Sequence, residues 1–88
     1  MASYSIQLKH AVEKDLRTIT KSLVKRIWER LESLANDPLP RQSIKLAGAE
    51  HLYRLRVGEF RIIYGVDHEA KNVTIYHVRH RREAYRKS

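Results

Sequence analysis

The sequence predicts a single α+β domain over residues 1–88, with an N-terminal strand, a helical hairpin, a three-stranded antiparallel meander and a short C-terminal helix. Two observations predict this single-domain fold. Apolar residues recur every three or four positions in much of the first half, as in helices, and every second position before and after it, as in strands. The length of 88 residues suits one modest core and is too short for two.

The first half of the chain is predicted to contain one strand and two helices. Polar and apolar residues alternate over residues 3–8, and the helical period then covers about residues 10–35. A weak helix-forming stretch in its middle predicts a break, with Thr20 or Ser22 as the cap of the second helix. Pro38 ends this helix, because a proline disfavours helical backbone at the residue before it.

The second half is built around a predicted β-hairpin over residues 53–66, whose strands meet at a tight turn around Gly58. A connector over residues 41–50, with a short extended piece, leads into it. A polar turn then leads to a last strand over residues 73–78, and the basic tail over residues 79–87 is predicted to form the short helix.

The hairpin places its arginines on one face. Side chains alternate along a strand, so Arg54 and Arg56 share one side of the first strand, and Leu55 points to the other. Across the turn, the side chain of Arg61 points to the side opposite to that of the apolar Ile62. If the apolar sides of both strands face one core, the three arginines share a surface. A slip of one residue in the strand pairing would invert this arrangement.

The charge of the chain points to a polyanionic partner. The formal net charge is +8, and residues 41–88 carry most of it, with eleven Lys or Arg against five Asp or Glu. Nucleic acid is the first interpretation. An acidic protein that neutralises the basic surface is compatible with it, whereas no basic amphipathic helix supports a membrane surface as partner.

Composition also excludes some kinds of chemistry. The chain contains no cysteine, which rules out disulfides, thiolate chemistry and cysteine-ligated zinc. No signal region opens it and no apolar run approaches the length of a membrane span, so we expect a cytoplasmic protein.

The order of elements and three short stretches resemble the RelE/ParE superfamily of toxins from bacterial toxin–antitoxin pairs. The closing His-Arg-Arg-x-x-Tyr pattern is similar to the RelE branch rather than the ParE branch. The resemblance covers nearly the whole chain, and the stretches that carry it are residues 44–48, residues 53–64 and residues 80–85.

Membership of the RelE branch implies a RelE-like microbial ribonuclease fold and an activity. The implied activity is a ribosome-dependent endoribonuclease that cuts messenger RNA in the A site, with no metal and no small-molecule cofactor. The implied partners are the ribosome, the messenger and a RelB-like antitoxin that neutralises the toxin, with no membrane. The expected catalytic set is Arg61, Arg81, Tyr85, Arg56 and His80, and the expected RNA-binding set is Arg54, Lys45, Arg79 and Arg82.

Metal-free cleavage by the 2′-hydroxyl needs a proton acceptor, charge stabilisation on the phosphate and a donor to the leaving 5′-oxygen. Arg61 suits the phosphate, because its guanidinium matches phosphate geometry and stays charged. Arg81 is expected at the leaving oxygen and Tyr85 at a base or the 2′-hydroxyl. Arg56 supplies charge, since arginine does not accept a proton. Well-known relatives have lysine at this position and at that of Arg54.

The proton acceptor is therefore an open question in the sequence. An imidazole titrates near neutrality, which favours His80, with His77 as the other candidate. If His80 is the base, cleavage should depend on pH between about 6 and 7.

Two other functions remain open from the sequence. A ParE-like inhibitor of DNA gyrase would share the fold and perform no cleavage. A basic nucleic-acid-binding module without activity is the third alternative.

Overall fold

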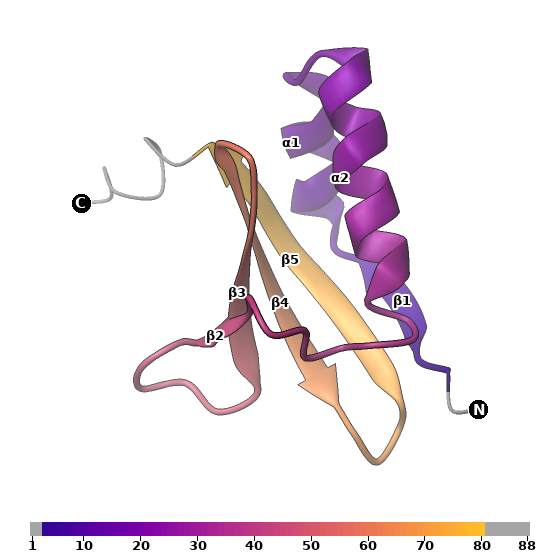
Figure 1. Cartoon of the computed structure of the whole chain (residues 1–88), viewed down its shortest axis with the longest axis vertical. Coiled ribbons are helices and arrows are strands. Elements are labelled where there is room, and N and C mark those ends of the chain that lie inside the picture. The colour runs from indigo at the N-terminus through magenta and orange to yellow at the C-terminus, as the bar shows by residue number, and fades with distance from the viewer. Residues whose placement is uncertain (1–2, 81–88) are drawn as a thin grey trace.

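The computed structural model describes residues 3–80, which form two helices and five strands (Figure 1). The predicted α+β class and the order of its elements are confirmed for this part of the chain. In chain order the elements are β1 (Ser5–Leu8), α1 (His10–Arg17), α2 (Lys21–Ser33), β2 (Ile44–Lys45), β3 (Leu52–Val57), β4 (Phe60–Asp67) and β5 (Asn72–His80).

The strands form one five-stranded sheet in the order β1-β5-β4-β3-β2. The predicted meander is its centre, because β3, β4 and β5 pair antiparallel. β1 adds to one edge, parallel to β5, and the short β2 adds to the other edge, antiparallel to β3. Both helices lie on the same side of this sheet, so the helices cover one face only (Figure 1).

The predicted break between the helices is confirmed. α1 ends at Arg17 and is followed by its C-cap Thr18, whose side-chain hydroxyl donates to the carbonyl oxygen of Asp15 at 2.9 Å. Thr20 is the N-cap of α2 in extended backbone conformation, and its side chain makes no capping hydrogen bond. Ser22, the alternative cap, lies inside α2. In residues 3–80, neither helix combines the length and the apolarity that crossing a bilayer requires.

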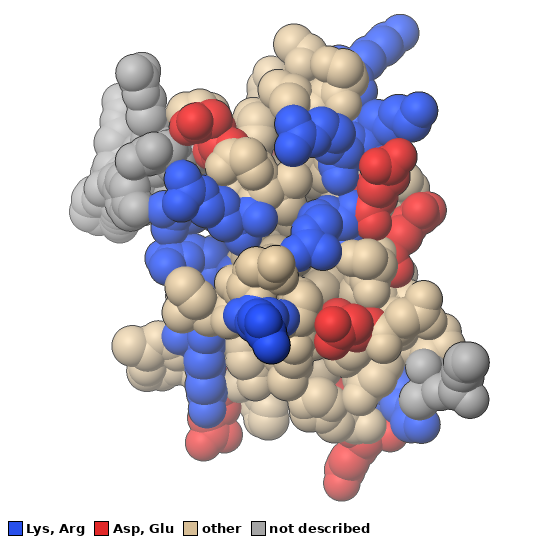
Figure 2. Space-filling model, in the orientation of Figure 1, with Lys and Arg blue, Asp and Glu red and all other residues tan. Residues whose placement is uncertain are grey.

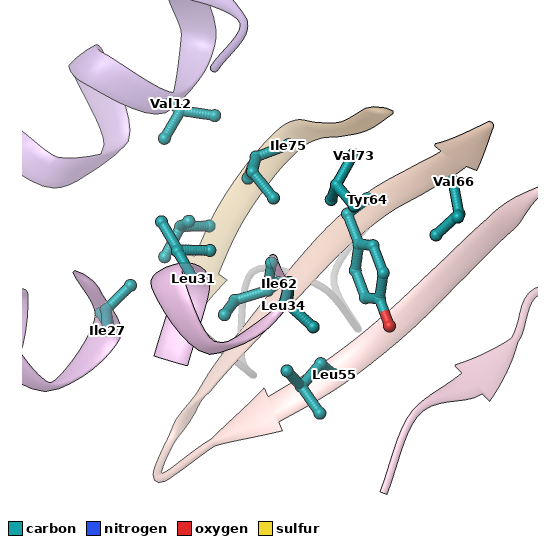
Figure 3. Packing of buried hydrophobic residues seen from close by; sticks show 11 residues of the cluster. Val12, Ile27, Leu31, Leu34, Leu55, Ile62, Tyr64, Val66, Val73 and Ile75 are labelled. Atoms are coloured by element: carbon teal, nitrogen blue, oxygen red, sulfur yellow. The ribbon is translucent and has the colours of Figure 1, made fainter. Parts of the chain in front are cut away.

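The core lies between the helices and the sheet (Figure 3). Both helices, the C-cap residue of α2 and the three central strands contribute side chains to it, namely Val12, Ile27, Leu31, Leu34, Leu55, Ile62, Tyr64, Val66, Val73, Ile75 and Val78. Tyr64 is the largest, and its hydroxyl donates to the carbonyl oxygen of Pro38 at 2.8 Å. This bond ties the segment after α2 to β4. Burial raises the pKa of Tyr64.

The predicted hairpin has the predicted register. β3 ends at Val57 and β4 begins at Phe60, and Gly58 in the turn has φ of 59°, a left-handed conformation that glycine adopts without a Cβ penalty. Leu55 pairs with Ile62, and both are buried against the helices. The apolar sets therefore share the core, as the alternation predicted.

The prediction for the start of the C-terminal tail is wrong. Arg79 and His80 belong to β5, because they continue its pairing with Arg61 and Phe60 of β4. The remainder of the predicted helix, residues 81–87, lies outside the described residues.

Candidate nucleic-acid interface

Three arginines form a row across the three central strands. Arg56 of β3 pairs directly with Arg61 of β4, and Arg61 pairs directly with Arg79 of β5. Their neighbours along the strands, such as Ile62, face the helices, so the row lies on the face of the sheet that points away from the helices. We call Arg56, Arg61 and Arg79 the arginine row and this face the outer face. The shared surface predicted for the hairpin arginines is confirmed.

A second row lies next to the first on the outer face. Arg54 pairs with Ile63, and Ile63 pairs with His77. Arg54 and His77 are each two residues from a member of the arginine row, so they face the same side. The outer face thus contains four arginines and one imidazole near the turn of the hairpin.

A β-bulge in β5 decides which side chains reach this surface. The register shifts between Ile63 and Tyr64, because Ile63 pairs with His77 whereas Tyr64 pairs with Ile75. Tyr76 is the extra residue between them. Such a residue changes the alternation of every side chain that follows it in the strand.

The apolar spacing of β5 shows the effect of the bulge. Val73, Ile75 and Val78 are all buried, so the interval between core residues is first two and then three. His77 and Arg79 consequently face outward. Strict alternation from Val73 would have placed His77 and Arg79 in the core. The three-residue spacing between Ile75 and Val78 is the signal in the sequence that indicates the bulge.

Two predicted site residues lie away from the arginine row. His80 pairs with Phe60 on the helix-facing side of β5, where the two rings meet edge to face with centroids 5.3 Å apart. Lys45 pairs with Tyr53, which packs against the core, whereas the outward position of β2 is opposite Arg54. The register therefore places His80 and Lys45 on the other side of the sheet.

The two outer members of the row are held by neighbouring groups. Arg56 donates from Nε to the carbonyl oxygen of Gly58 at 3.3 Å, which directs it toward the hairpin turn. At the other end, Arg79 Nη2 lies 3.1 Å from His77 Nδ1 and Arg79 Nε lies 3.7 Å from Asp15 Oδ1. Asp15 comes from α1, and nothing in the sequence pattern marked it as part of this surface.

Arg61 lies at the centre of the row and is buried. Arg61 is 7% exposed, and it is the one charged residue among residues 3–80 that is buried. A guanidinium in a site that excludes water interacts with a phosphate more strongly than one in bulk solvent. Figure 2 shows Lys and Arg gathered beside the turn end of the hairpin, with few Asp or Glu among them.

The opposite end of the outer face has a different character. A hollow of about 680 Å³ lies beside Gly65 and Tyr76, and its lining includes Glu50, Asp67, Glu69 and two histidines. Carboxylates repel phosphates, so RNA contacts are expected at the arginine row rather than in this hollow. Within residues 3–80, no group of three or more His, Asp or Glu is arranged to hold a metal ion.

Three predicted site residues, Arg81, Arg82 and Tyr85, lie outside the described residues. Their part in the site remains a prediction from the resemblance. The described part of the site is therefore the arginine row with Arg54, His77 and Asp15.

The comparison with known proteins extends over nearly the whole chain. The family model for the ParE toxin of the type II toxin–antitoxin system parDE matches residues 6–85. A RelE1 protein of Methanocaldococcus jannaschii, named as a toxin, is 29% identical over 86 residues, which cover 94% of this chain and 96% of that protein.

Solved structures show the same relationship. A chain from the archaeal RelE–RelB complex of Pyrococcus horikoshii OT3 superposes with a TM-score of 0.82 and 31% identity, covering 92% of this chain and 98% of that chain. A chain from the toxin–antitoxin complex RelBE2 of Mycobacterium tuberculosis gives a TM-score of 0.78 and 25% identity, with 89% and 98% covered. This chain belongs to the ParE toxin family of type II toxin–antitoxin systems and, within the RelE/ParE superfamily, to the RelE branch.

Proposed function

We propose that this toxin is a ribosome-dependent endoribonuclease that cuts messenger RNA in the ribosomal A site and so stops translation in the cytoplasm. The observation that carries the proposal is the arginine row, with a buried Arg61 at its centre, on the sheet face that points away from the helices. Similarity to RelE toxins supports the same activity.

The proposed reaction uses the RNA itself as the nucleophile. The 2′-hydroxyl attacks the adjacent phosphorus, and the bond from phosphorus to the 5′-oxygen breaks. The products are a 2′,3′-cyclic phosphate and a 5′-hydroxyl end. The proton of the 2′-hydroxyl passes to a base, and a donor gives a proton to the leaving oxygen. Arg61 stabilises the charge that develops on the phosphate oxygens.

We place His77, rather than His80, at the reacting phosphate on the basis of its position. His77 lies on the outer face beside the row, whereas His80 faces the helices. Arg54 and Arg56 hold and neutralise RNA, since arginine stays protonated. Arg81 at the leaving oxygen and Tyr85 at a base or the 2′-hydroxyl complete the proposal, as the resemblance implies.

The proposal includes an antitoxin partner of RelB type. The similar structures from Pyrococcus horikoshii and Mycobacterium tuberculosis are toxin–antitoxin complexes. A chain with a formal charge of +8 presents a surface that an acidic partner would neutralise. Such a partner would compete with RNA for the arginine row.

Primer extension on ribosome-bound messenger tests the proposal. Induction of the toxin should produce cuts at codon-related positions, and purified ribosomes with a bound messenger should reproduce them. The same RNA without ribosomes is the control and should stay intact. Absence of cuts on translated messengers would refute the proposed activity.

The ParE family match favours a second candidate, inhibition of DNA gyrase. This activity would need no cleavage chemistry. A supercoiling assay with purified gyrase separates the two candidates, because a gyrase inhibitor would abolish supercoiling and leave messengers uncut. The outward arginine row favours the ribonuclease.

A further inference from the structure

On the edge of β5 that faces α1, a backbone N–H group is hydrogen-bonded to a side chain instead of to a neighbouring strand. β1 pairs with β5 only as far as Leu8, opposite Ile75, and the chain then turns into α1. Asp15 of α1 accepts a hydrogen bond at Oδ2 from the backbone N–H of Val78 at 3.0 Å. This carboxylate therefore satisfies an edge donor that β1 does not reach.

The same carboxylate lies close to two side chains of the outer face. Asp15 Oδ1 is 3.7 Å from Arg79 Nε, and Asp15 Oδ2 is 3.9 Å from His77 Nδ1. The Asp15 side chain is 17% exposed, against 43% for Arg79 and 39% for His77. A carboxylate so far removed from water needs a charged or hydrogen-bonding partner, and Arg79 supplies the charge.

The contact between Arg79 and His77 determines where the imidazole carries its proton. Arg79 Nη2 and His77 Nδ1 are 3.1 Å apart. A guanidinium only donates hydrogen bonds, so Nδ1 accepts and the neutral ring is protonated on Nε2. Asp15 holds the Arg79 guanidinium in the place from which it makes this bond.

The position of Asp15 also matters for the arginine row. Arg79 is directly opposite Arg61, and like charges directly opposite on neighbouring strands repel each other. We infer that Asp15 is a positioning residue, which draws the Arg79 guanidinium to the β5 edge and thereby orients both Arg79 and His77 beside Arg61. The effect on cleavage rests on the proposed function, whereas the effect on the tautomer of His77 does not.

The first test is Asp15→Asn, which keeps a carbonyl oxygen for the Val78 N–H and removes the charge. Glu13→Gln is the matched control, because Glu13 is on the same helix, is exposed, and has His10 as its ion-pair partner at 3.8 Å. The single-turnover cleavage rate and the RNA dissociation constant are measured separately on messenger-programmed ribosomes. Asp15→Asn should lower the rate about 10-fold, since small misplacements of reacting groups reduce rates strongly, and Glu13→Gln should match the wild type.

The second test asks whether Asp15 acts through Arg79. The rates of Asp15→Asn, Arg79→Ala and the double variant form a cycle. If Asp15 positions Arg79, the Asp15 change should lower the rate much less in the Arg79→Ala background than in the wild type. Losses that multiply in the double variant would mean that the two residues act independently, and this would overturn the inference.

The third test reads the His77 ring by nitrogen NMR and needs no cleavage. The wild type and Glu13→Gln should show a single Nε2-protonated tautomer at neutral to slightly alkaline pH, and Asp15→Asn should show a mixture. If the wild type cuts no messenger but the tautomer changes in Asp15→Asn, the proposed function fails and the positioning role stands. An unchanged tautomer together with an unchanged rate in Asp15→Asn would overturn the positioning role.

Discussion

The two faces of the β3–β4 hairpin share a backbone but differ in the interactions that their side chains make. On the helix-facing side, Leu55, Ile62 and Tyr64 are fully buried and pack among other apolar side chains. On the outer side, Arg56 and Arg61 face each other directly as like charges. Packing explains the first face, whereas sheet stability alone does not explain the second. Adjacent residues of one strand can therefore be assigned by their face, either to folding or to the proposed RNA surface.

Arg61→Ala should have the largest effect on activity. Loss of one preorganised charge at a reacting phosphate should lower the single-turnover cleavage rate by about 100- to 1000-fold. Arg61→Lys keeps the charge and loses the two-pronged geometry, so an intermediate loss is expected. Wild-type cleavage by Arg61→Ala would show that the outer face is not the reactive surface.

Ile62→Ala, one residue further along β4, should instead lower stability. Removing a buried isoleucine side chain costs about 2–5 kcal/mol of the free energy of unfolding, measured by denaturant titration. Ile62→Val should cost about 0.5–1.5 kcal/mol and should leave the cleavage rate of the folded protein unchanged. A rate that falls in Ile62→Val without a change in stability would contradict the separation of the two faces.

Tyr64→Phe should lower stability by about 1 kcal/mol, because it removes the hydrogen bond to the Pro38 carbonyl. Burial raises the pKa of Tyr64, so the folded state holds this proton more tightly than the unfolded state. Stability should therefore fall as the pH rises above about 10, the ordinary tyrosine pKa, and Tyr64→Phe should weaken this dependence. Tyr53→Phe is the control, and an equal loss in both variants would contradict the role of the Pro38 bond.

Arg54→Gln and Lys45→Gln should have the smallest effects and compare the two sides of the sheet at one edge. For each single-stranded phosphate contact that is lost, the slope of log affinity against log salt should fall by about 0.7. Arg54→Gln should show this change in fluorescence anisotropy with a short RNA, whereas Lys45→Gln should keep the wild-type slope. The reverse result would place RNA on the helix-facing side of the β2 edge.

The sequence predicted the hairpin well because its local signals agree. Gly58 specifies the turn, and the alternation of apolar and basic residues leaves one register that buries the apolar set. The break between the helices was also predictable, since the residues from Thr18 to Thr20 are weak helix formers.

The sequence was less informative about β5 and about contacts distant in the chain. The extra residue Tyr76 reverses the alternation, which moves His77 to the outer face and His80 to the helices. The approach of Asp15 to Val78 depends on how α1 packs against the edge of β5, and no local pattern encodes it. For this reason the position of Arg61 could be predicted from alternation, and the choice between the two histidines could not.

The parallel pairing of β1 with β5 has a consequence for folding. Ser5 pairs with Asn72 and Leu8 with Ile75, so the first strand has its place in the sheet only when the last strand is present. Contacts between residues so far apart in the chain slow the folding of small domains. Arg61 and Arg79 also come together only through β5. During synthesis, the chain therefore cannot assemble its arginine row until β5 has been made. A chain interrupted before residue 72 has no strand with which β1 can pair, and it lacks the Arg79 and His77 of the proposed reactive surface.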